Sequence, residues 1–145
     1  MKVFFDTSVL VDLDRQKETT VSALEDATRM DTELWISTVT VSEILVGALL
    51  RKDHDKATLR AREVLGRFVW QDLDGDAAER TARLMAHLYA AGTPIEYQDV
   101  AIAGCALAAH ADVLVTENKE HFERFPPLAG KVVAASGLAK KLKGR

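Results

Sequence analysis

Acidic residues recur where short apolar runs give way to helix-like patterns. Asp6 directly follows the apolar residues 3–5 and precedes Thr7-Ser8, which opens a helical spacing of apolar residues. Glu43 lies near the start of a second helical segment, and Asp99 near the start of a third. Carboxylates held a few ångströms apart repel one another unless a cation binds between them. Carboxylate oxygens without cysteine or histidine partners suit Mg²⁺ or Mn²⁺, so the pattern predicts a metal site that hydrolyses phosphodiesters.

A further polar cluster follows the strand-like run 112–116. Thr116 closes this run, and Glu117, Asn118 and Glu120 come directly after it. In an open α/β sheet, ligands bind outside the carboxyl ends of the strands. We therefore expect this cluster to reach the same edge of the sheet as Asp6.

Simpler roles remain open for each of these residues at this point. Asp6 and Asn118 could cap helices, because Asp and Asn are favoured at helix starts. Glu43 and Asp99 could be solvated first-turn acids that the helix dipole favours. Spacing alone does not decide between these roles and a metal site.

The cysteine and histidine content excludes other kinds of site. Cys105 is the only cysteine, so the chain has no intramolecular disulfide, and its apolar surroundings predict a small core residue. The histidines show no catalytic-triad or zinc-ligand spacing: His54, His87, His110 and His121. His121 is expected to be a helix-surface residue that precedes a buried Phe122.

Apolar periodicity alternates between short strands and helices along the chain. Strands are expected at 3–5, 34–37, 68–70, 112–116 and 131–133. Helices are expected over 18–30, 38–50, 57–65, 74–91 and 98–110, with a loop–helix element over 117–125. Strands separated by helices predict a parallel sheet covered on both faces, and thus an α/β/α sandwich.

Length and composition indicate one globular domain over residues 1–145. A chain of 145 residues with 48% hydrophobic content can bury a core without metal or disulfide cross-links. The net charge of −3 argues against a broadly basic surface that coats nucleic acid. No apolar run approaches the ~20 residues of a membrane span, so we expect a soluble, cytoplasmic protein with no membrane partner. Residues 137–145 are expected to form a flexible basic tail.

Four segments together resemble the PIN domain family, and most closely its VapC-type toxins from toxin–antitoxin pairs. They are VFFDTSVL (3–10), SEILVG (42–47), QDVAIA (98–103) and VTENKEHF (115–122), in the family's order. The resemblance implies a PIN-like three-layer α/β/α sandwich with a mostly parallel sheet. It also implies a Mg²⁺- or Mn²⁺-dependent endoribonuclease that forms a homodimer. A cognate antitoxin would pack its carboxy-terminal segment along the helices near the site and block it.

The resemblance also carries residue roles. Asp6, Glu43 and Asp99 match the family's acidic metal-binding positions, with Glu43 binding the metal or activating the attacking water. Asn118 falls on a fourth position that is often acidic, which removes one charge.

Neighbouring residues would complete such a site. Glu117 or Glu120 could supply the missing charge. Thr116 and Thr7 would be hydrogen-bond partners that hold the ligands in place. Basic residues near the rim are candidates for RNA contacts, and the sequence does not rank them: Lys2, Arg15, Lys17, Arg51, Lys52, Lys56, Lys119 and Arg124.

Two other functions remain open. A PIN-like domain could bind RNA or a protein without cleavage, which Asn118 at the fourth position makes possible. A receiver-type phosphoacceptor domain would need an acceptor aspartate after its third strand. Here Gln71-Asp72 follows that strand while the other acids lie elsewhere, which disfavours the receiver.

Overall fold

The short apolar runs form one five-stranded sheet in which every strand pair is parallel. The computed structural model describes residues 1–144. The strands are β1 (Lys2–Phe5), β2 (Glu33–Ser37), β3 (Val69–Gln71), β4 (Val113–Val115) and β5 (Val132–Val133). Their order in the sheet is β3-β2-β1-β4-β5, so β1 lies at the centre.

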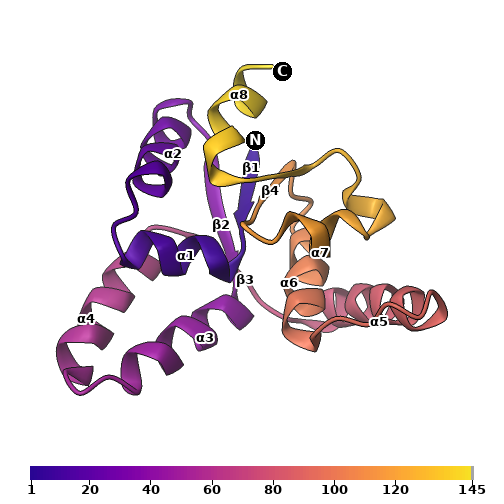
Figure 1. The fold of residues 1–145 in the computed structure, drawn as a ribbon, viewed down its shortest axis with the longest axis horizontal. Helices are drawn as coiled ribbons and strands as arrows, with labels where there is room; N and C mark the ends of the chain where they lie inside the picture. Colours follow the sequence, from indigo (N-terminus) through magenta and orange to yellow (C-terminus); the bar gives the residue numbers. More distant parts are fainter. Residues whose placement is uncertain (145) are drawn as a thin grey trace.

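Helices connect successive strands and cover both faces of the sheet (Figure 1). They are α1 (Thr7–Asp14), α2 (Glu18–Arg29), α3 (Thr38–Leu49), α4 (His54–Leu65), α5 (Gly75–Ala90), α6 (Tyr97–Ala108), α7 (Lys119–Glu123) and α8 (Leu138–Lys143), with 3₁₀ turns η1 (Pro126–Leu128) and η2 (Ala135–Gly137). This arrangement confirms the predicted α/β/α sandwich and its parallel sheet.

The alternation of side chains along β1 divides the core into two layers. Val3 and Phe5 pack with residues of α1, α2 and α8 on one face of the sheet. Phe4 points the other way and packs with α5, α6 and α7. Successive strand residues face opposite sides, so a strand that is apolar throughout must be covered on both.

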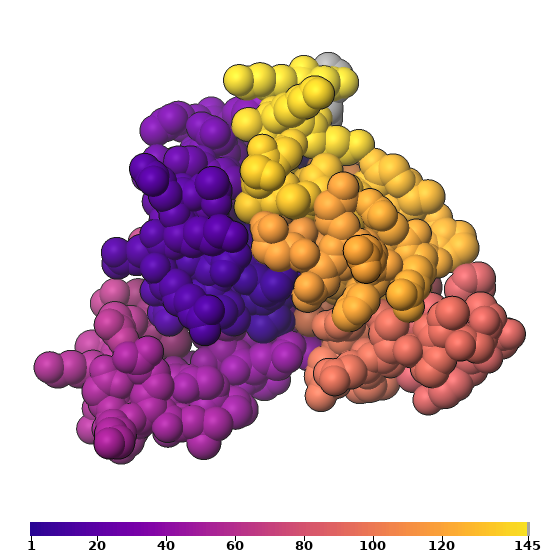
Figure 2. Space-filling view, in the orientation of Figure 1, coloured from indigo at the N-terminus to yellow at the C-terminus, as the bar shows by residue number. Residues whose placement is uncertain are grey.

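The register of β1 against β4 brings distant parts of the chain together. Phe5 pairs with Val115, and the Asp6 amide donates to the Val115 carbonyl oxygen over 2.9 Å. Asp6 and Thr116 therefore leave the sheet side by side. In Figure 2 the indigo amino-terminal region accordingly lies against the orange segment around α7.

The carboxy terminus differs from the expected flexible tail. Leu138 to Lys143 form α8, whose buried Leu138 and Leu142 pack in the same core cluster as α2. The leucine spacing of four residues places both on one helix face, a signal that the many lysines obscured. Arg145, the last residue of the expected tail, lies outside the described residues.

α5 and α6 pack closely, and their closest approach lies at Gly104 in the second half of α6. A Cβ added at Gly104 would overlap the Thr81 hydroxyl and lie 2.9 Å from the Ala77 carbonyl oxygen. Only glycine lets the two backbones approach this closely.

Within residues 1–144, no helix is both long and apolar enough to cross a membrane.

Candidate active site

Asp6 occupies the N-cap position of α1, but its side chain does not cap the helix. The residue is 1% exposed, and it forms no side-chain capping hydrogen bond. Its Oδ2 instead accepts hydrogen bonds from the hydroxyls of Ser8 and Thr116, each over 2.8 Å. The capping role that the sequence left open is therefore not the one that Asp6 takes.

Backbone amides after β4 orient the two hydroxyls that hold Asp6. The Asn118 amide donates to Thr116 Oγ1 over 2.9 Å, and the Glu117 amide donates to Ser8 Oγ over 3.1 Å. Each hydroxyl thus accepts one hydrogen bond and gives its own proton to the carboxylate. This arrangement favours the ionised form of Asp6.

Glu43 reaches the site from the second turn of α3. No acidic residue lies in the first turn of α3, so the helix-dipole role does not apply to Glu43. Glu43 Oε1 accepts a hydrogen bond from Thr7 Oγ1 over 2.9 Å, which joins α3 to the first residue of α1. Thr7 Oγ1 also lies 2.9 Å from Thr40 Oγ1.

Asp99, in the first turn of α6, contacts His121 of α7. The distance from His121 Nδ1 to Asp99 Oδ2 is 3.0 Å, and both side chains are partly buried. His121 lies on the surface of α7 as expected, with its side chain 41% exposed, but its ring also contacts Asp99, which the sequence did not predict. This contact arises only where α6 and α7 meet in the tertiary fold, and the neighbouring Phe122 is buried as expected.

The acids lie within one another's electric field. Burial raises the pKa of Asp6 above its usual range, the hydroxyls of Ser8 and Thr116 oppose this shift, and the Asp99 charge adds to it. Burial likewise raises the pKa of Glu43. Thr7 opposes that shift, and the charges of Asp6, Asp99 and Glu96 add to it.

Each of the three acids uses one oxygen for the protein and leaves the other available. Protein donors occupy Asp6 Oδ2, Glu43 Oε1 and Asp99 Oδ2. No Lys or Arg among residues 1–144 forms a salt bridge with any of them. Buried or partly buried carboxylates that repel one another and have no Lys or Arg partner are a donor set that suits a hard divalent cation.

The side chains do not yet surround a common point. In the described part of the chain, no group of three His, Cys, Asp or Glu residues lies close enough to hold a metal ion. The residue types fit Mg²⁺ or Mn²⁺, and a cation would have to draw the available oxygens of Asp6, Glu43 and Asp99 inward.

The fourth position has a different environment from the three acids. Asn118 is exposed at the N-cap of α7, where its side chain forms no capping hydrogen bond. Glu117 is directed away, because its Oε1 accepts a hydrogen bond from the Ala135 amide at η2 over 3.1 Å. Glu120 is exposed on α7. Glu117 therefore supports η2 in this structure.

Several residues of the site were missed by sequence reasoning. Ser8, Thr40 and His121 contact the acids or their partners, and Glu96 adds its charge. Thr40 could have been noticed, because it lies three residues before Glu43 and shares its helix face. Glu96 likewise lies three residues before Asp99 at the N-cap of α6, whereas its approach to Glu43 and that of His121 to Asp99 arise only through tertiary packing.

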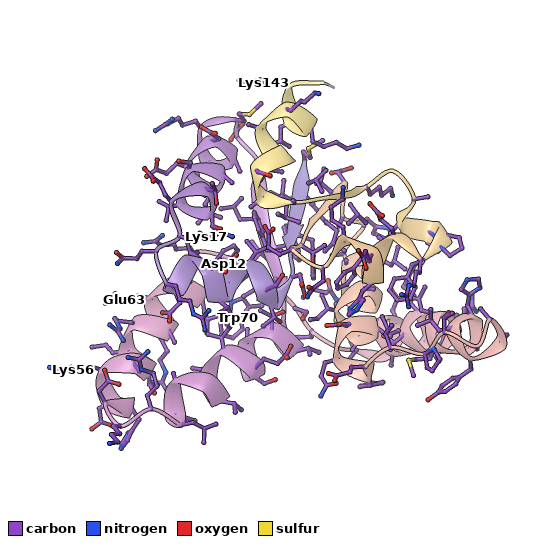
Figure 3. The ribbon with its side chains drawn as sticks, in the orientation of Figure 1. Asp12, Lys17, Lys56, Glu63, Trp70 and Lys143 are labelled. Atoms are coloured by element: carbon purple, nitrogen blue, oxygen red, sulfur yellow. The ribbon has the colours of Figure 1, made fainter. Side chains whose placement is uncertain are left out.

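A groove leads away from the acids between α1, α3 and α4. It has a volume of about 480 Å³ beside Glu43 and carries three arginines on its walls, Arg15, Arg51 and Arg60. Asp14 and Arg60 line both this groove and a second hollow of about 690 Å³ between α2 and α4. In Figure 3, Glu63 marks the α4 side of that hollow.

Comparison with known families and structures gives a consistent result. The PIN domain family model matches residues 3–126. No curated protein sequence matches the chain.

Solved structures share the fold over nearly the whole chain. VapBC2 from Rickettsia felis, bound to a promoter DNA fragment, is 23% identical with a TM-score of 0.84, over 92% of this chain and 98% of that one. DNA-bound VapBC from Salmonella typhimurium is 26% identical with a TM-score of 0.81, over 93% and 98%. A toxin–antitoxin complex from Klebsiella pneumoniae is 26% identical with a TM-score of 0.68, over 92% and 97%.

Proposed function

The chain belongs to the PIN domain family, as its sequence motifs predicted, and we propose that it is a Mg²⁺- or Mn²⁺-dependent endoribonuclease, the toxin of a toxin–antitoxin pair. The observation that carries this proposal is the buried Asp6 close to the partly buried Glu43 and Asp99, three acids that form no salt bridge with a Lys or Arg of residues 1–144. The similarity to toxin–antitoxin complexes supports the biological role.

In this mechanism the chain supplies the ligands of the cation and keeps them oriented. Asp6, Asp99 and the available oxygen of Glu43 would hold the cation, which would polarise the phosphoryl oxygen and lower the pKa of the attacking water so that its proton passes to solvent. Thr116, Ser8, Thr7 and His121 keep the three carboxylates oriented.

Cleavage of a mixed cellular RNA pool tests the proposal. The purified protein is incubated at low salt with Mg²⁺, with Mn²⁺ or with EDTA, beside Asp99→Asn and the control Glu120→Gln on exposed α7. Discrete fragments that disappear with EDTA and with Asp99→Asn, but persist with Glu120→Gln, are expected. No cleavage by a folded wild-type protein that binds Mn²⁺ would favour a PIN-like module that binds without cutting.

The antitoxin is the second part of the proposal. The groove beside Glu43 and the hollow between α2 and α4 share Asp14 and Arg60, so a peptide that bound across both would cover Glu43. Arg67 lines the hollow between α2 and α4. It also lines a further hollow whose walls include Leu24 and Leu34. Arg67→Glu is expected to weaken copurification with a small protein encoded beside this chain. Arg83→Glu on exposed α5 is the matched control.

A homodimer is the remaining partner in the proposal. Val46 and Leu49 of α3 and its C-cap residue Leu50 are exposed to solvent, by 54%, 59% and 81%. Apolar side chains grouped on one helix favour an interface. Light scattering is expected to give twice the chain's mass for the wild type and a monomer for Leu49→Asp. A monomeric wild type would contradict this part.

A further inference from the structure

A chain of hydroxyl groups runs from the end of β2 to Glu43. Ser37 and Thr40 are both fully buried. The Thr40 amide donates to Ser37 Oγ over 3.1 Å, and Ser37 Oγ donates to Thr40 Oγ1 over 3.4 Å. Thr40 Oγ1 lies 2.9 Å from Thr7 Oγ1, which in turn donates to Glu43 Oε1 over 2.9 Å.

The number of protons fixes the direction of this chain. A hydroxyl has one proton to donate, and an ionised carboxylate can only accept. Thr7 gives its proton to Glu43, so in the Thr7–Thr40 contact Thr40 must be the donor. All three hydroxyls then point their protons toward Glu43. Such one-way chains strengthen each of their hydrogen bonds.

A buried hydroxyl at position 40 is not needed to fill space. Valine has the same shape as threonine and would avoid the cost of burying a polar group. Thr40 and Glu43 lie three residues apart on α3, and Thr7 is the first residue of α1. The hydroxyl of Thr40 therefore links the two helix starts that carry Glu43 and Asp6.

We propose that Thr40 is a positioning residue of the active site. By donating to Thr7, it commits the only Thr7 proton to Glu43 Oε1 and so leaves Oε2 available to the metal or to water. Without the Thr40 hydroxyl, Thr7 is free to turn, and Glu43 loses its fixed orientation. The role of Thr40 in metal binding rests on the proposed function, whereas the hydrogen bonds between the hydroxyls do not.

Mn²⁺ affinity, measured by electron paramagnetic resonance, is the first test. Thr40→Val keeps the shape and removes the donor, and it is expected to bind Mn²⁺ about 10- to 100-fold more weakly than the wild type. Thr40→Ser is expected to restore wild-type affinity. Since Thr40 acts through Thr7, the double variant Thr7→Val/Thr40→Val should bind no more weakly than Thr7→Val alone.

A second readout needs no metal. The ¹³C chemical shift of the Glu43 carboxyl, measured in EDTA at fixed pH, is expected to move in Thr40→Val and to return in Thr40→Ser. Unchanged affinity and an unchanged shift in a folded Thr40→Val, or full additivity with Thr7→Val, would overturn the proposal. A wild type that binds no Mn²⁺ would contradict the proposed function, and the carboxyl shift alone would then decide the role of Thr40.

Discussion

Thr116 donates its hydroxyl to Asp6 Oδ2 over 2.8 Å and joins the ends of two neighbouring strands that lie 110 positions apart in the sequence. The same pattern recurs at the other acids, where Thr7 holds Glu43 and His121 holds Asp99. Each partner binds one carboxylate oxygen and leaves the second. Metal-ligating carboxylates are commonly held by hydrogen bonds in this way.

Loss of the Thr116 hydroxyl should weaken the site without unfolding the protein. Thr116→Val keeps the buried shape but removes a donor to Asp6, and Asn118 loses the acceptor for its amide. We expect cleavage to fall about 10- to 100-fold. The rate under saturating RNA measures the effect, and Thr116→Ser should retain most activity. Wild-type rates in Thr116→Val would show that Ser8 alone suffices to orient Asp6.

The raised pKa of Asp6 predicts a pH-dependent stability. The native state holds the proton of Asp6 more tightly than the unfolded state does. In EDTA, the free energy of unfolding should therefore fall as the pH rises from the ordinary pKa of an aspartate, which applies to the unfolded state, to the higher pKa of Asp6 in the native state. Above the native pKa, the lost free energy is not regained. Asp6→Asn lacks the charge and should not show this contribution.

Urea denaturation between pH 4 and pH 8 measures this difference. Asp6→Asn should be the more stable protein at pH 8 in EDTA, and the advantage should shrink at pH 4. Mg²⁺ should stabilise the wild type more than the variant, because a ligand of the native state raises stability by mass action. If the free energy of unfolding depends on pH in the same way for both proteins, the pKa of Asp6 is not raised in the native state.

His121 should affect activity more than stability. His121→Ala removes the contact with Asp99 Oδ2, and the imidazole is partly exposed, so little packing is lost. Cleavage is expected to fall by about 10-fold or more while the melting temperature stays close to that of the wild type. His87→Ala, on exposed α5, is the control. An active His121→Ala would leave Asp99 oriented by α6 alone.

Gly104 should be intolerant of even one methyl group. In Gly104→Ala the new Cβ meets the Thr81 hydroxyl and the Ala77 carbonyl oxygen, so α5 and α6 must separate. The free energy of unfolding should fall by about 1–3 kcal/mol. Gly47→Ala is the matched control, because nothing lies within 4 Å of its added Cβ. That variant should gain about 0.5–1 kcal/mol from helix propensity.

The fold and the position of Asp6 followed from local signals. Apolar runs of three to five residues marked the strands, and the order of strands and helices required a parallel sheet. Asp6 was placed at the edge of the sheet because it ends β1. Its partner Thr116 was named only through the resemblance to the PIN domain family.

Other contacts needed the tertiary structure. His121 reaches Asp99 only because α7 packs on α6, and no spacing in the sequence encodes this contact. Thr40 looks like an ordinary residue at a helix start until α1 brings Thr7 against it. Helix α8 was mistaken for a flexible tail because it contains more lysines than leucines. The four-residue spacing of Leu138 and Leu142, which places both on the buried face, was overlooked.

Asp6, Glu43 and Asp99 are expected to share one divalent cation. Mn²⁺ binding, followed by electron paramagnetic resonance, tests it most directly in the wild type, Asp6→Asn, Glu43→Gln, Asp99→Asn and the control Glu120→Gln. Binding of one cation per chain is expected for the wild type and the control, with strong loss in each of the other three. A folded wild type that binds no Mn²⁺, or an Asp99→Asn variant that binds it with unchanged affinity, would contradict the claim.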